Sequence, residues 1–138
     1  MDLETQRGIY CVCQIQGRQW PPWVDCTHFH SLTVTGDEQS VVCLDQDIPG
    51  DVRKEGGWRL LKIRGPLAFT LVGILSSLIS PLATAGISIF ALSTFDTDYL
   101  LIKAESFSAA CQILTQRGHV IYGGDFYDSE NATDTGHY

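Results

Sequence analysis

Apolar and polar residues alternate in several short stretches of the first half of the chain. The stretches at 8–15 and 28–35 are rich in β-branched and aromatic residues, and residues 40–44 follow a polar turn at 36–38. Alternation with this composition is typical of half-buried strands, and a polar turn between two of them predicts a hairpin. Consecutive prolines at 21 and 22 exclude a strand interior, so a short irregular or single-turn helical segment is expected there.

A different pattern governs the chain between Arg64 and Asp96, where 31 consecutive residues include no Asp, Glu, Lys or Arg. The large aliphatic residues of this block recur with the period of a helix, and its serines fall toward the other side. We therefore expect a helix that begins at Phe69 or Thr70, bends or loosens at Pro81 and ends at Gly86. A membrane span is the alternative, which the segregated serines and the internal proline and glycines disfavour.

The elements of the second half follow one another as strand, helix, strand, strand, helix, strand. Strands are predicted at 58–64, 87–94, 98–103 and 119–122, and the second helix at 105–117. This βαββαβ order predicts an α+β, ferredoxin-like sandwich. The strand, short helix and hairpin of the first half look like a truncated copy of the same unit. The expected organisation is a truncated unit at 1–50, a polar connector at 45–57, a complete unit at 58–123 and an acidic, poorly ordered tail at 124–138.

Charge and cysteine content narrow the functional classes. Sixteen acidic and nine basic residues give a net charge of −7, which argues against nucleic-acid binding because the basic residues are few and scattered. The first residues do not form a basic region followed by an apolar stretch, so we expect no secretory signal. Five cysteines, an odd number without the spacing of a disulfide scaffold, favour a reducing, cytoplasmic setting.

Residues with catalytic or metal-binding chemistry are present, but their arrangement is not typical of an enzyme. Cys11, Cys13, Cys26, His28 and His30 form a C-x-C…C-x-H-x-H pattern. Structural zinc sites use other spacings, and cysteines in strands more often serve as small buried hydrophobes. No pattern places a nucleophile beside a base, and the glycines match no nucleotide-binding fingerprint. We therefore predict no catalytic residue, no metal and no cofactor.

The uncharged block and the turn that follows it suggest a site for a small zwitterion. The first N–H groups of a helix attract a carboxylate, and the Asp98 carboxylate can accept hydrogen bonds from an ammonium group. The alternative for Asp98 is a turn residue that bonds its own backbone. Thr94 and Phe95 are alternatively ordinary strand residues with one face in the core.

The segment 58–119 resembles the ACT domain, the βαββαβ module that senses amino acids. It is similar to the small stand-alone ACT proteins and to the ACT repeats of CASTOR-type arginine sensors. The resemblance rests on W-R-L-L-K-I-R-G-P-L-A-F at 58–69, G-I-L at 73–75, P-L-A-T-A-G-I-S-I at 81–89, S-T-F-D-T-D-Y at 93–99 and E-S-F-S-A-A at 105–110. The hairpin at 36–43 also looks like the first-half hairpin of the stand-alone proteins, which extends the likeness to about three quarters of the chain.

The resemblance implies a non-enzymatic, cytoplasmic regulatory module that binds an amino acid between two ACT units, either of one chain or of a homodimer. The positions that match the family's ligand-binding residues are Ser40, Val41, Ala68, Phe69, Leu71, Gly73, Ile74, Thr94, Phe95 and Asp98. Arginine sensors present an acidic side chain to the guanidinium where this chain has Leu71, so a neutral or smaller amino acid is expected instead of arginine. The alternative function is a dimerising interaction module that has lost its ligand.

Overall fold

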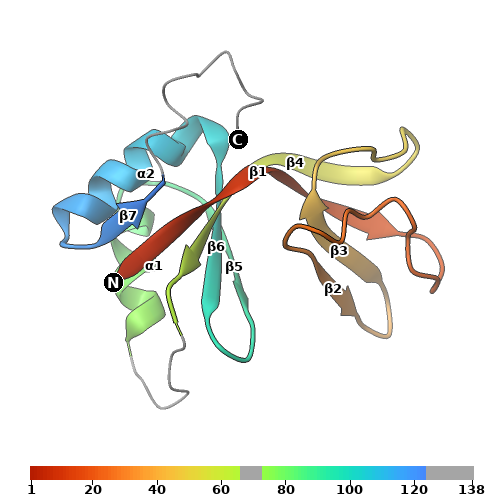
Figure 1. Ribbon diagram of the computed structural model, residues 1–138, viewed down its shortest axis with the longest axis horizontal. Coiled ribbons are helices and arrows are strands. Elements are labelled where there is room, and N and C mark those ends of the chain that lie inside the picture. The colour runs from red at the N-terminus through yellow and green to blue at the C-terminus, as the bar shows by residue number, and fades with distance from the viewer. Residues whose placement is uncertain (66–72, 124–138) are drawn as a thin grey trace. The chain divides into compact units, whose positions relative to one another are not determined.

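The computed structural model describes residues 1–65 and 73–123, which fall into two compact units. One unit combines Met1–Arg7 with the chain from Arg59 onward, and the other is Gly8–Trp58. Two long strands, β1 (Asp2–Ile15) and β4 (Arg53–Ile63), contribute residues to both units. The elements of each unit are labelled in Figure 1.

The unit that contains the helices has the βαββαβ order that the sequence predicts. After β4 come α1 (Ile74–Thr84), β5 (Ile89–Ser93), β6 (Asp98–Lys103), α2 (Ala104–Gln116) and β7 (Val120–Tyr122). In its sheet β4 lies beside β6, and β6 pairs in antiparallel register with β5. The predicted α+β, ferredoxin-like fold is therefore confirmed.

The start of the chain adds a strand to this unit that the sequence pattern did not predict. β1 begins at Asp2 and pairs in parallel with β7, whereas the predicted strand began at Gly8. On the other side of β1 lies β4, and the Arg64 amide just after β4 donates to the Asp2 carbonyl at 2.9 Å. The Arg64 side chain holds the same region together, because its Nε lies 2.7 Å from a Glu4 carboxylate oxygen and its guanidinium lies over the ring of Tyr122.

The core of this unit lies between the two helices and the strands that they cover. The fully buried strand residues of the cluster are Leu3, Leu61, Ile63, Leu100 and Ile102, and the helices contribute Leu78, Leu82, Phe107, Ala110 and Leu114. The buried pairs on β4 and β6 are two residues apart, and those on the helices are three or four apart, so each set occupies one face of its element. No helix of residues 1–65 and 73–123 is long and apolar enough to cross a membrane.

Helix α1 begins later than predicted but ends where predicted. Gly73 precedes it with φ of 82°, a left-handed conformation that a helix cannot run through. The predicted start at Phe69 or Thr70, which lie outside the described residues, is therefore too early for this helix. Gly86 has φ of 78°, and its amide closes the last turn on the carbonyl of Ala83 at 3.0 Å, which confirms it as the C-terminal stop.

The Gly8–Trp58 unit is built from strands and the loops that connect them. β2 (Ser31–Val34) and β3 (Gln39–Leu44) form the predicted hairpin, and β3 also pairs in antiparallel register with β1. The amide of Val24 donates to the carbonyl of Pro21 at 3.3 Å, which confirms a single turn after the two prolines.

The connector predicted at 45–57 is shorter than expected, because β4 already begins at Arg53. The pair Gly56-Gly57, predicted to belong to the connector, lies inside this strand. Gly57 has φ of 81°, and a Cβ at Gly56 would come within 2.9 Å of an Asp45 carboxylate oxygen. These glycines therefore permit an irregular backbone and a close approach within a strand, which the composition alone does not distinguish from a loop.

Candidate functional site

The turn between β5 and β6 is tied to the end of β4 by a buried threonine. The hydroxyl of Thr97 donates to the carbonyl of Ile63 at 2.5 Å, and Thr97 is only 6% exposed. Within the turn the Thr94 amide donates to the Thr97 carbonyl at 2.8 Å, and the Thr94 hydroxyl accepts from the Thr97 amide at 3.3 Å. The turn is therefore held beside the strand end from which the chain leads toward α1.

Thr97 was not among the predicted site residues. The signal that identifies it in retrospect is the spacing T-x-x-T at 94–97, in which the first threonine closes the turn locally and leaves the second free to bond elsewhere. Because its partner at Ile63 is far away in sequence, no local pattern predicts that contact.

Asp98 stands at the first position of β6, directly opposite Ser93 at the end of β5. The Ser93 hydroxyl donates to one Asp98 carboxylate oxygen at 2.6 Å. Among the described residues, the Asp98 carboxylate thus accepts its hydrogen bond from the side chain of Ser93 and not from a backbone N–H of the turn. The turn-residue alternative for Asp98 is thus not what the structure shows, and its ligand-binding role stays a prediction.

The other predicted residues of the turn are at the surface. Thr94 is exposed, and Phe95 has 80% of its surface exposed, an unusual position for a large aromatic side chain. The interpretation of Thr94 and Phe95 as strand residues with one face in the core is therefore wrong, because β5 ends at Ser93.

The start of α1 supplies the second half of the predicted site. Its first turn contains no acidic residue, and Gly73 at the N-cap provides no side-chain hydrogen bond. Ile74 opens the helix, so the backbone N–H groups of this turn lie at the positive end of the helix dipole. Figure 1 shows the start of α1 and the β5–β6 turn at the same end of this unit.

The remaining predicted ligand residues fall elsewhere. Ala68, Phe69 and Leu71 lie outside the described residues. Ser40 and Val41 belong to β3 in the Gly8–Trp58 unit, where Ser40 is half-buried and lines an open groove of about 480 Å³ together with charged residues of β4. The side chain of Val41 is fully buried in the core of that unit.

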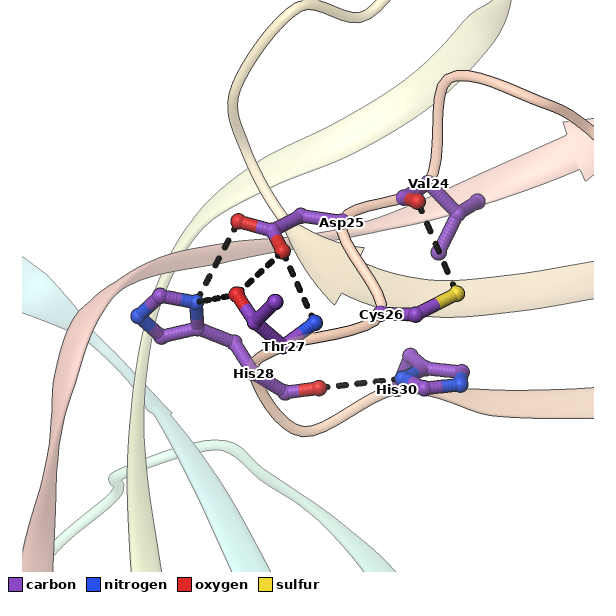
Figure 2. Close-up of polar contacts among 6 residues, drawn as sticks. All are labelled: Val24, Asp25, Cys26, Thr27, His28 and His30. Atoms are coloured by element: carbon purple, nitrogen blue, oxygen red, sulfur yellow. Dashed lines mark hydrogen bonds and ion pairs between the residues drawn. The ribbon is translucent and has the colours of Figure 1, made fainter.

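The Cys/His pattern of the first half does not form the site that its spacing suggests. Figure 2 shows that Asp25, Thr27 and His28 bond one another, with the His28 Nδ1 3.2 Å from an Asp25 carboxylate oxygen. The Nδ1 of His30 lies at hydrogen-bonding distance, 2.9 Å, from the carbonyl oxygen of His28. The Cys26 thiol donates to the carbonyl of Val24 in the same loop. The hydrogen bonds from Thr27 lower the pKa of Asp25 because they favour its charged form.

Cysteines 11 and 13 lie on the same face of β1, as the alternation predicts, and both are fully buried. The third member of their group is Cys43 and not Cys26. Across residues 1–65 and 73–123, these three thiols form the one group of three or more Cys, His, Asp or Glu side chains close enough to share an ion.

Comparison with known proteins supports the same interpretation of the fold. The family model for the ACT domain matches residues 53–116, and a second family model, for an N-terminal domain, matches residues 8–51. The human protein named cytosolic arginine sensor for mTORC1 subunit 1 is 36% identical over 61 residues, which are 44% of this chain and 18% of that protein. The chain thus spans less than a fifth of the length of this curated relative.

Two solved structures are similar over most of the chain. Protein Atu0741 from Agrobacterium tumefaciens is 41% identical, with a TM-score of 0.81, over 87% of this chain and 90% of that one. The regulatory subunit of aspartate kinase from Thermus thermophilus is 13% identical, with a TM-score of 0.54, over 82% of this chain and 94% of that one. At that identity the second likeness concerns the fold alone.

Proposed function

Because this chain belongs to the family of small ACT-domain proteins, a regulatory class of module, we propose that it binds a free amino acid in the cytoplasm without chemically converting it. The relative named as a cytosolic arginine sensor supports this proposal. The observation that carries it is the anchoring of the β5–β6 turn to the end of β4 through Thr97 and Ile63.

That anchoring gives the two halves of a zwitterion complementary partners on one unit. Asp98 supplies a carboxylate, held in orientation by Ser93, for the α-ammonium group. The N–H groups at the start of α1 offer donors and a positive dipole end for the α-carboxylate. The exposed ring of Phe95 in the same turn is available to cover an apolar side chain of the ligand.

The side chain of the ligand is proposed to be neutral or small. By the resemblance, Leu71 matches the position where the arginine sensors present an acidic group, so a guanidinium would have no charge partner from that residue. Burial of an unpaired cation costs several kcal/mol, which would exclude arginine at physiological concentrations. We further propose that the partner in a homodimer completes the site with its Ser40, which lines the open groove of the Gly8–Trp58 unit.

Thermal unfolding of the purified protein with each of the twenty amino acids at millimolar concentration tests the proposal. A ligand present at 100 times its dissociation constant stabilises the folded state by about 2.7 kcal/mol. We expect one or a few neutral amino acids to raise the unfolding temperature, and arginine to leave it unchanged.

Asp98→Ala and Asp96→Ala form a matched pair for this measurement. Both remove a carboxylate from the same turn, but Asp96 is exposed and Asp98 is the residue bonded to Ser93. We expect the ligand-dependent shift to vanish in Asp98→Ala and to persist in Asp96→Ala. An unchanged unfolding temperature across the whole panel would favour the interaction module without a ligand, and an equal shift in both variants would remove Asp98 from the site.

A further inference from the structure

The Gly8–Trp58 unit contains a group of three buried thiols that the proposed amino-acid site does not use. Cys11 and Cys13 lie two residues apart on β1, and Cys43 on β3 is the direct cross-strand partner of Cys11. Their three sulfur atoms all lie within 4.8 Å of one another, and the sulfurs of Cys11 and Cys13 are 3.5 Å apart. The arrangement follows from strand geometry, which places residues i, i+2 and the cross-strand partner on one face.

These dimensions match a three-coordinate metal site. With metal–sulfur bonds of about 2.3 Å, the sulfurs of a trigonal site stand about 4.0 Å apart, within the range of the observed triangle. Zinc in structural sites requires four ligands, and within residues 1–65 and 73–123 no fourth Cys, His, Asp or Glu ligand atom joins the group. Soft monovalent copper accepts a purely thiolate ligand set and does not require the fourth ligand.

The surroundings of the thiols suit a soft ion that must be kept from water. All three cysteines are fully buried, and Val24 and Val41 complete the cluster with them. Half-buried Trp23, Ile48 and Val52 pack against it, and all three come from the connecting segments before β2 and before β4. Ile15, the last residue of β1, packs against the cluster as well, so strand residues and connecting segments together enclose the thiols.

Charge and protonation set the conditions for binding. Burial, followed by hydrogen bonding with Cys11, raises the pKa of Cys13 to about 12. The hydrogen bond with Cys43, followed by burial, also raises the pKa of Cys11. An ion that binds these thiols as thiolates displaces their protons into water. Lys54, bonded to Asp45 at 2.7 Å, provides a nearby positive charge that favours the thiolate of Cys13.

We propose that Cys11, Cys13 and Cys43 form a trigonal thiolate site that binds one copper(I) ion inside the Gly8–Trp58 unit. Binding involves no change of oxidation state: the ion enters as copper(I), three metal–sulfur bonds form, and the displaced thiol protons pass to the buffer. The proposal does not depend on the amino-acid site, because none of the three cysteines is a residue of that site.

Anaerobic titration of the reduced full chain with copper(I), in competition with a copper(I) chelator of known affinity, tests this proposal. We expect one ion per chain, a thiolate-to-copper charge-transfer band in the ultraviolet, and quenching of the Trp23 emission because Trp23 packs on the cluster. Binding should tighten as the pH rises, since protons compete with the ion.

The two remaining cysteines supply the matched control. Cys26 is exposed and Cys111 lies in the other unit, so the double variant Cys26→Ser/Cys111→Ser leaves only the three clustered thiols. We expect it to retain one copper ion and the charge-transfer band, whereas Cys11→Ala/Cys43→Ala should lose both.

Two results would overturn the site. One is a double variant Cys26→Ser/Cys111→Ser that does not compete with the chelator. The other is copper binding of unchanged affinity in Cys11→Ala/Cys43→Ala. The first measurement stands by itself if the second variant does not fold, because the first variant leaves the buried cluster intact.

Discussion

Replacement of Thr97 by valine tests the anchor of the proposed site most directly. The substitution keeps the β-branched shape of the side chain and removes only the hydroxyl that donates to the Ile63 carbonyl at 2.5 Å. A hydrogen bond contributes about 1 kcal/mol net, and an acceptor left without a partner in a buried site costs about 1–3 kcal/mol. Because Thr97 is 6% exposed, we expect Thr97→Val to lower the free energy of unfolding by about 1–2 kcal/mol.

Thr115 offers the same chemical change in a different environment. Its hydroxyl donates to the Cys111 carbonyl at 2.7 Å one turn earlier in α2, but this bond lies at the surface. Water replaces a lost bond there, so Thr115→Val should change the stability by no more than about 0.5 kcal/mol. The comparison of the two variants therefore isolates the contribution of burial from that of the hydroxyl group itself.

The two units can be followed separately in one urea titration. Both described helices belong to the unit of Thr97, whereas Trp20, Trp23 and Trp58 all lie in the Gly8–Trp58 unit. Circular dichroism of the helices thus reports the first unit and tryptophan fluorescence reports the second. With a slope of about 2 kcal/mol per molar urea, Thr97→Val should move the helix transition by roughly 0.5–1 M toward lower urea. A shift no larger than that of Thr115→Val would refute the reasoning.

Two further changes probe the backbone and a buried titratable group. Gly8 has φ of 100°, and a Cβ there would collide with the Leu44 side chain, so Gly8→Ala should lower the free energy of unfolding by more than the ~1–2 kcal/mol of left-handed backbone strain. Gly17 has φ of 80° with open space around it, so Gly17→Ala should show the strain alone. Unfolding followed by tryptophan fluorescence measures both variants. Burial and the nearby N-terminal charge lower the pKa of His119 from its ordinary value of 6.5, so the unfolded chain gains a proton before the folded one does. The contribution of His119 to the free energy of unfolding should be fully present above pH 6.5 and be lost as the pH falls below it. Helix unfolding measured at about pH 7.5 and 5.5 should therefore show a loss of stability that is smaller in His119→Gln. An unchanged pH dependence in this variant would contradict the assignment.

The amino-acid sequence is sufficient to predict the elements whose signals are local. The strand at 98–103, the hairpin around 36–38 and the helix stop at Gly86 depend on alternation, turn composition and a left-handed glycine, all within a few residues. The βαββαβ order follows from placing these elements in sequence. For the same reason the start of α1 was predicted too early: apolar periodicity continues through Gly73, and its left-handed backbone is not visible in that pattern.

Long-range pairing is what only the tertiary structure decided. The polar residues of 2–7 show no strand alternation, and they become a strand because β4 and β7 flank them on both sides. Register brings Cys43 opposite Cys11, whereas sequence spacing had grouped Cys11 with Cys26 and the histidines. The bond from Thr97 to Ile63 spans 34 positions, and it aligns the acidic turn with the end of β4. Such contacts depend on which strands become neighbours and in what register they pair. Neighbours and register are set by the burial of whole faces of the sheet, and this burial cannot be deduced from a pattern of a few neighbouring residues.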